Sequence, residues 1–313
     1  MTHSSSHRPP LAAILVVPVV VAVILTLFAW PLAKLGPRDV PVGVAGAPAL
    51  AERMAAQDGK FDVHRYDSEA AIRTAIEDRE VYGGFVAGPS GAKVLTASAG
   101  SPAVAQMLTH AAAEGGKAVQ VEDVVAAPPA GGALPASVLP LVIGGLLVGV
   151  LAALATSSAL RRAALIVAGS LLAGVAGAAI VQSWLEVVDG DWAVNAAALS
   201  LTVLAIAATV VGLHALMGRA GILVAALTMV FVGNPFSGVA TGPEMLPGPA
   251  GAIGQLLPPG AGGNLLRSTG FFDGAGGGRH IAVLAIWALA GFAALGIAAA
   301  RRRLAPTPEV AMA

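Results

Sequence analysis

Four carboxyl and amide side chains are the best candidates to contact a substrate: Glu186, Asn195, Asn234 and Glu244. Glu186 and Asn195 lie at the ends of neighbouring apolar stretches, Asn234 interrupts another, and Glu244 lies between two proline-containing turns. Ionisable and strongly polar groups at membrane depth are costly and mark substrate paths by default. We therefore predict that these four residues line a path. The alternative for Glu186 and Asn195 is an ordinary helix terminus that meets water, and for Glu244 a structural role in its loop.

The other reactive side chains do not indicate bond-making chemistry. The six histidines share no metal-ligand spacing with one another or with carboxylates, and the chain has no cysteine. The segment GPSGAK at 88–93 lacks the spacing and the Ser/Thr of a phosphate-binding loop, so a hairpin turn is the better interpretation. We expect no catalytic residue, metal site, cofactor or ATPase motif, and the protein is not predicted to be an enzyme.

Six apolar stretches predict a polytopic α-helical membrane protein. Of the 313 residues 56% are hydrophobic and 12% charged, whereas soluble domains carry about a quarter charged residues. Roughly 20 apolar residues span the bilayer core as a helix. The predicted spans are 11–30, 138–157, 163–185, 193–216, 220–236 and 281–300, with 220–236 the weakest because Gly233, Asn234 and Pro235 interrupt it. Stretch 11–30 is longer than the apolar core of a signal peptide, which predicts an uncleaved anchor.

The arginines between these stretches predict the orientation. Arg161 and Arg162 separate the second and third stretches, Arg219 the fourth and fifth, and Arg301–Arg303 follow the sixth. Arg8 precedes the first, whereas the linker at 186–192 is acidic. Basic loops stay cytoplasmic. This places the N-terminus (1–10) and the tail (304–313) in the cytoplasm. The Ala-, Gly- and Arg-rich composition suggests a bacterial source, so we expect the protein in a bacterial plasma membrane. The net charge of zero gives no reason to expect nucleic acid.

The segment 31–136 predicts an extracytoplasmic α/β domain between the first and second spans, ending in a linker at 126–136. Asp67 or Ser68 can cap a helix that runs to Asp78, and Pro102 suits the first position of a helix opened by Ser101. Alternating or short apolar runs predict five strands, at 40–44, 61–66, 81–86, 93–97 and 119–125, and a first helix at 47–56.

The segment 233–279, before the last span, predicts a broken, partly re-entrant hairpin at the outer face. Its prolines, Pro235, Pro247, Pro258 and Pro259, and its many glycines do not suit a continuous helix. Its leucines are nevertheless too frequent for a solvated loop. Irregular backbone at membrane depth is tolerated only where protein or a wet cavity surrounds it.

Three segments carry a resemblance to a known family: VPVGVAG at 40–46, DSEAAIRTAIEDREVYGGFVAG at 67–88, and the run from GNPFSG to LLRSTGFFDG at 233–274. In these segments, and in the order of anchor, external domain and five-helix block (137–303), the chain resembles the type-2 ABC exporter permeases, and more closely their phage-infection-protein-like branch. The resemblance implies a dimeric unit that moves a hydrophobic or amphipathic substrate outward with energy from a separate ATP-binding subunit.

Two functions therefore remain open. The first is the membrane subunit of an export system, with Arg161 and Arg162 contacting the ATPase. The second is a non-transporting surface protein, anchored by its helices, whose external domain binds a partner or a cell-envelope component. The spacing of Gly145 and Gly149 permits close helix contact, either within the chain or in a homodimer.

Overall fold

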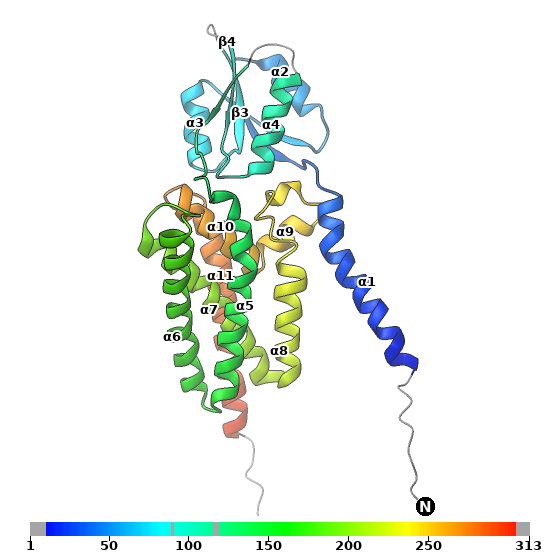
Figure 1. Cartoon of the computed structure of the whole chain (residues 1–313), viewed down its shortest axis with the longest axis vertical. Helices are drawn as coiled ribbons and strands as arrows, with labels where there is room; N and C mark the ends of the chain where they lie inside the picture. The colour runs from blue at the N-terminus through cyan, green and yellow to red at the C-terminus, as the bar shows by residue number, and fades with distance from the viewer. Residues whose placement is uncertain (1–10, 89–90, 115–118, 305–313) are drawn as a thin grey trace, which may run out of the picture.

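The computed structural model describes residues 11–88, 91–114 and 119–304. The predicted cytoplasmic end 1–10, residues 305–313 of the predicted tail and the tip of the predicted turn at 89–90 lie outside this range. The described chain is mostly helical, and a small mixed sheet sits at one end of a helical bundle (Figure 1). We call the two ends of the bundle the domain end and the distal end.

The α/β domain is built on a five-stranded sheet in the order β2-β1-β3-β4-β5. Neighbouring strands run parallel except β3 and β4, which form an antiparallel hairpin. The five predicted strands are confirmed with small shifts at their ends: β1 (Val40–Ala45), β2 (Phe61–Tyr66), β3 (Gly83–Gly88), β4 (Gly91–Thr96) and β5 (Gln120–Asp123).

Three helices cover the two faces of this sheet. Helices α2 (Pro48–Ala55) and α4 (Pro102–Glu114) pack on one face, and α3 (Glu69–Glu77) packs on the other (Figure 1). The predicted caps are present, because the Ser68 hydroxyl accepts a hydrogen bond from the Ala71 N–H at 3.2 Å and Ser101 accepts one from Val104 at 3.2 Å. These caps satisfy N–H groups that a helix start leaves unpaired.

Among the residues that the structure describes, five helices are long and apolar enough to cross a membrane. They are α1 (Leu11–Ala33), α5 (Leu134–Ala155) with the short η1 (Gly131–Ala133), α6 (Ala159–Ala178) with the π-helical η2 (Ala179–Trp184), α7 (Trp192–Met217) and α11 (Gly277–Leu304). The fifth predicted span is a shorter apolar helix, α8 (Arg219–Ala226) continued by the π-helical η3 (Leu227–Gly233). A sixth span therefore stays a prediction.

Helix α7 is the centre of the bundle. Of its most apolar stretch 78% is buried, against 33% for α5 and for α11, which pack around it. Gly145 and Gly149 on α5 face α7, where a Cβ atom would approach Ile206 at 2.8 Å and Val210 at 2.6 Å. The Gly145–Gly149 spacing therefore serves close packing within the chain.

Helix α1 stands apart from the other helices (Figure 1). Only 6% of its apolar stretch is buried. Its contacts with the bundle lie near its C-terminal end, where Phe28 packs edge-on against Phe231 and Trp30 against Phe236, each pair with ring centroids 6.3 Å apart.

The segment 233–279 is broken, as predicted, but part of it is a regular helix. It contains η4 (Pro243–Met245), α9 (Ala250–Gln255) and α10 (Pro258–Phe271). The run PPGAGGN, which we expected to be irregular, opens α10, because Pro258 and Pro259 occupy its first turn, where a missing N–H costs no hydrogen bond. Every residue of α10 from Pro258 to Gly270 is buried.

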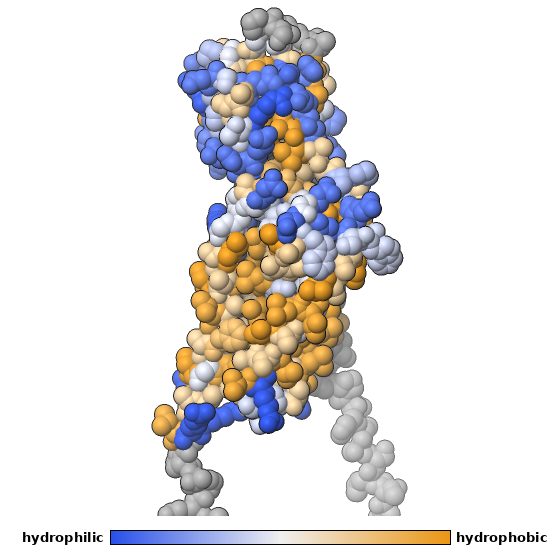
Figure 2. Space-filling model, turned by 90° about the vertical axis from the view of Figure 1, so that its left-hand side faces the viewer, coloured by the Kyte–Doolittle hydropathy of each residue, from blue (hydrophilic) through white to orange (hydrophobic). Residues whose placement is uncertain are grey.

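The surface of the molecule is divided into bands. On the face that Figure 2 shows, the α/β domain is mostly hydrophilic, the bundle carries a wide hydrophobic band, and hydrophilic groups lie at the distal end. Arg162, Arg302 and Arg303 lie together at that distal end, where they line one cavity. The apolar helices and the hydrophobic band indicate a multi-pass membrane protein.

Candidate functional site

Arg79 joins the α/β domain to the bundle. It follows α3 with a positive φ of 62°, a left-handed conformation that usually belongs to glycine. The turn directs its side chain to α10, where Nη1 donates hydrogen bonds to the Ser268 hydroxyl and, at 3.2 Å, to the Asn264 carbonyl. The guanidinium also lies 5.2 Å from the ring centroid of Phe272. Burial lowers the pKa of Arg79, and the nearby Tyr82 and Glu244 oppose this shift.

Tyr82 and Glu244 form a second connection between the two parts. The Tyr82 hydroxyl, just before β3, donates a 2.7 Å hydrogen bond to Oε2 of Glu244 in η4. Burial and the neighbouring carboxylate both raise the pKa of Tyr82, so the phenol stays a neutral donor. The Arg38 N–H donates to the Glu244 carbonyl at 3.0 Å, and Ser101 donates to the Thr241 carbonyl at 2.7 Å.

Behind these contacts lies a buried polar network in the bundle. Asn264 donates to Oε1 of Gln255 at 2.9 Å and accepts from Arg267 at 3.1 Å. Arg267, only 3% exposed, also donates to the Val239 carbonyl at 2.6 Å. Its Nε atom has no hydrogen-bond partner in the described part of the chain. Such a network fixes the Pro- and Gly-rich segment in one arrangement.

These groups surround a junction cavity of about 230 Å³. Its ionisable lining consists of Arg79, Arg279, His280 and the single carboxylate Glu244, with Tyr82 as a neutral donor. The predominance of basic groups suits a small anionic group, and Glu244 offsets part of the positive charge. Side chains of the domain and of the bundle both line the cavity.

A larger, apolar groove lies in the bundle wall near the domain end. Its volume is about 480 Å³, in the range of small-molecule sites. Helices α5 and α7 and the end of α6, continued by η2, form its walls. Ser137 is the only polar side chain among its described lining residues. The groove can accept an acyl chain or another apolar group.

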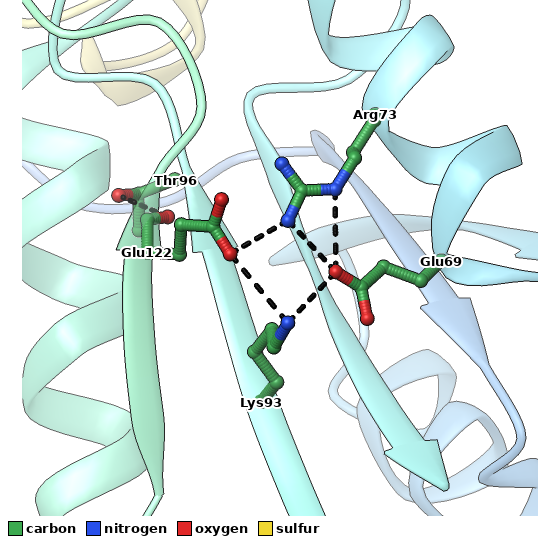
Figure 3. Close-up of polar contacts among 5 residues, drawn as sticks. All are labelled: Glu69, Arg73, Lys93, Thr96 and Glu122. Atoms are coloured by element: carbon green, nitrogen blue, oxygen red, sulfur yellow. Dashed lines mark hydrogen bonds and ion pairs between the residues drawn. The ribbon is translucent and has the colours of Figure 1, made fainter.

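A charged cluster on the α/β domain joins α3 to the edge of the sheet (Figure 3). Arg73 donates to Glu69 at 2.7 Å and to Glu122 at 2.6 Å, and Lys93 reaches the same two carboxylates at 2.9 and 3.5 Å. Hydrogen bonds from Lys93 lower the pKa of Glu69, and those from Arg73 lower that of Glu122. With two cations matched to two anions, the cluster serves to hold β4 and β5 to α3.

The structure does not bring the four predicted path residues together in one cavity. Glu186 is exposed at the end of η2, with a positive φ of 51°. Asn195 is buried in the first turn of α7, where its amide donates to Gln182 at 3.0 Å and to the Asp189 carbonyl at 2.7 Å, so it lies at a helix terminus but does not meet water there. Asn234 lines a separate cavity beside Phe28 of α1. Glu244 alone lies in the junction cavity.

The four prolines of the predicted hairpin lie in turns and at the start of a helix. Pro235 lies beside Asn234 in the wall of that separate cavity, and Pro247 is buried before α9. Pro258 and Pro259 begin α10, and a Cβ atom on Gly233 would approach Pro259 at 2.7 Å. These contacts close the loop tightly against the end of η3.

The two arginines that were predicted to contact an ATPase, Arg161 and Arg162, differ in their exposure. Arg161 is exposed at the distal end. Arg162 is 6% exposed, and it donates to the carbonyls of Thr156 and Ala153, both at 2.7 Å. Arg162 therefore satisfies carbonyl groups that the C-terminus of α5 leaves unpaired. These hydrogen bonds give Arg162 a structural role at the end of α5.

Sequence reasoning missed Arg79, Tyr82, Gln255, Asn264 and Arg267. Periodicity does not report contacts between residues this far apart, but two signals were present. Arg267 is a charged residue within an apolar, Gly-rich segment, and such a residue needs buried partners. Arg79 and Tyr82 both lie in the segment 67–88 that carries the family resemblance.

No group of three or more metal-binding side chains occurs among the described residues. Comparison with known proteins found no matching family model, no matching curated protein and no matching solved structure.

Proposed function

We propose that the chain is the membrane subunit of an export system, which moves a hydrophobic or amphipathic substrate outward with energy from a separate ATPase. In this proposal the basic distal end faces the cytoplasm, following the positive-inside rule, and the α/β domain lies outside. The observation that carries the proposal is the extent to which the domain is built into the bundle.

A surface-binding domain needs only a tether, whereas this domain shares its interior with the bundle. Met245, from the η4 loop, packs into the core between the sheet and the α2/α4 face. Phe272, at the end of α10, packs into the core beneath α3. With the hydrogen bonds of Arg79 and Tyr82, these contacts transmit a movement of α10 to the domain. A domain coupled in this way suits a transporter better than a passive anchor.

The apolar groove supports the substrate class. It opens in the wall of the bundle, so a lipid-like molecule enters it from the bilayer without crossing water. The polar side chains in the middle of α7, Ser200, Thr202 and Thr209, donate to carbonyls of their own helix. The described part of the bundle therefore offers a lateral apolar site in place of a continuous hydrophilic pore. We expect a second copy of the chain to complete the substrate path. The apolar surface of α1, of which little is buried within one chain, is available to contact that second copy.

The export function is tested by purifying the tagged full chain from its own host in mild detergent and measuring co-purifying ATPase activity. We expect a stoichiometric ATPase that is reduced by Arg161→Glu or Arg219→Glu, both exposed at the distal end. Arg65→Glu, the same charge change on the exposed surface of the domain, is the control. A preparation without ATPase would contradict the export function and favour the anchored surface protein.

The groove is tested with a filled variant. A Cβ atom on Gly144 meets nothing within 4 Å, so Gly144→Leu places its side chain in the groove without a clash at Cβ. Gly296, on α11, also has nothing within 4 Å of its Cβ position, so Gly296→Leu is the matched control. Apolar molecules that co-purify with the protein are identified by mass spectrometry. Loss in the Gly144 variant alone supports a substrate groove, and equal retention in both variants argues against it.

A further inference from the structure

A cavity at the distal end of the bundle has the composition of an anion site. It measures about 280 Å³ and lies between the start of α6, the end of α11 and α7. Three arginines line it, Arg162, Arg302 and Arg303, with the hydroxyl residues Ser157 and Ser158. None of its described lining residues is acidic. We propose that this cavity binds the headgroup of an anionic phospholipid.

The three arginines are available to a ligand in different ways. Arg162 is held in place, because its Nε and Nη2 atoms donate to the carbonyls of Thr156 and Ala153. No described residue accepts a hydrogen bond from its Nη1 atom. Arg302 and Arg303 are exposed, and within residues 11–304, where described, neither forms an ion pair. One fixed and two free guanidinium groups can close around a phosphate, for which arginine has matching donor geometry.

The start of α6 adds to this site. Ser158 caps this 20-residue helix, and the first N–H groups of a helix carry a partial positive charge without intrahelical acceptors. Ala159 and Leu160, the first residues after the cap, line the cavity. The fixed charge of the arginines and the helix start therefore attract the same anion.

The apolar part of the cavity favours a lipid over free phosphate. Leu295, Ala298 and Ala215 form its inner side. Leu160 is 81% exposed although it lies beside two arginines, a position that suits the interface between headgroups and acyl chains. Basic pockets between the ends of spanning helices are general sites for anionic headgroups. The ligand class is therefore a phosphate ester with an attached acyl chain, and the inference does not depend on the export function.

The test uses the full chain in detergent, titrated with phosphatidylglycerol or phosphatidylcholine and followed by native mass spectrometry. We expect one phosphatidylglycerol to bind in preference to phosphatidylcholine. Arg302→Gln combined with Arg303→Gln should weaken this binding by about tenfold or more, because the change removes two of the three guanidinium groups that line the cavity and would hold the phosphate. Arg301→Gln, in the same helical turn but not in the cavity lining, is the control and should bind as the wild type does.

Two further measurements keep the inference open to refutation. Thermal unfolding in detergent tests whether the double variant is folded, which we expect because both arginines are exposed. Leu160→Ser should weaken phosphatidylglycerol binding, because it removes an apolar side chain that would contact the acyl chain. Equal binding of both lipids, or equal loss in the Arg301 control, would overturn the site. Displacement by inorganic phosphate at the concentration of the lipid would identify a phosphate site and overturn the lipid assignment.

Discussion

The Tyr82 hydroxyl donates a 2.7 Å hydrogen bond to the Glu244 carboxylate across 162 positions of sequence, and the pair joins the sheet of the α/β domain to the bundle. Tyr82→Phe leaves the mostly buried carboxylate without this donor and should destabilise the protein by about 1–3 kcal/mol. Glu244→Gln keeps an acceptor and should cost less. Thermal unfolding of the detergent-solubilised chain measures both, and a Phe variant as stable as wild type would contradict a role for the pair.

Arg79 allows a test that separates backbone from side chain. Asparagine adopts the left-handed conformation at φ 62° more readily than arginine does, so Arg79→Asn relieves the turn. It also removes the contacts with Ser268, Asn264 and Phe272. We expect a net loss of about 1.5–3 kcal/mol, the contribution of hydrogen bonds to a charged group. A neutral or stabilising effect in chemical denaturation would mean that Arg79 serves only the turn.

The contact between α7 and α11 is sensitive to a single methyl group. A Cβ atom on Gly291 would collide with the backbone carbonyl group of Ala208, whereas Gly296 on the same helix has open space at that position. Gly291→Ala should lower stability by about 1–3 kcal/mol through overpacking. Gly296→Ala should be neutral or slightly stabilising, because alanine is the better helix former. Size-exclusion chromatography after heating compares the two variants, and equal melting would argue against tight packing here.

The cluster of Glu69, Arg73, Lys93 and Glu122 predicts a pH dependence. The pKa values of Glu69 and Glu122 are lowered in the folded state, so their stabilisation is present above the usual glutamate pKa of about 4.3 and is lost as the pH falls through the lowered values. Stability of the domain should therefore fall on acidification.

Glu122→Gln removes one partner of Arg73 and should reduce this acid sensitivity. At neutral pH it should speed amide hydrogen exchange in α3 and β5 on the order of twofold, since exposed ion pairs contribute little. Exchange in α7 is the internal control. Unchanged exchange in α3 and β5, with the same pH profile as wild type, would show that the cluster is energetically neutral.

The two adjacent arginines at the distal end should respond differently to the same change. Arg162→Gln removes two hydrogen bonds to backbone carbonyls, one buried and one partly buried, and should cost about 1.5–3 kcal/mol. Arg161→Gln, at an exposed position, should stay within about 0.5 kcal/mol of wild type. Equal melting temperatures for the two variants would contradict the capping role of Arg162.

Local patterns in the sequence predicted the α/β domain well, because its elements are specified by residues close together in the chain. Alternation located β2, and Ser68 and Ser101 marked the starts of α3 and α4. The apolar stretches likewise located the spanning helices. Helix α10 was missed because proline and glycine disfavour helices in isolation, whereas burial on all sides and close packing favour one here.

The candidate site was mostly beyond prediction. Glu244 was selected from its place between prolines, but its partners are Tyr82, 162 positions away, and the cavity shared with Arg79. Neither periodicity nor turn chemistry reports such long-range pairs. Asn195 was selected as a path residue and Arg162 as an ATPase contact, because the sequence does not show that each donates to carbonyl groups of a neighbouring segment.

Because Met245 and Phe272 belong to the cores of the α/β domain, the domain cannot complete its folding until late in synthesis of the chain. The last strand of the sheet ends at Asp123, yet one core of the domain includes Met245 and the other includes Phe272. At about 5–20 residues per second, synthesis of the intervening chain takes on the order of ten seconds. The nascent domain therefore stays incomplete until the chain has been synthesised through α10, so its final closure follows the synthesis of every helix except α11.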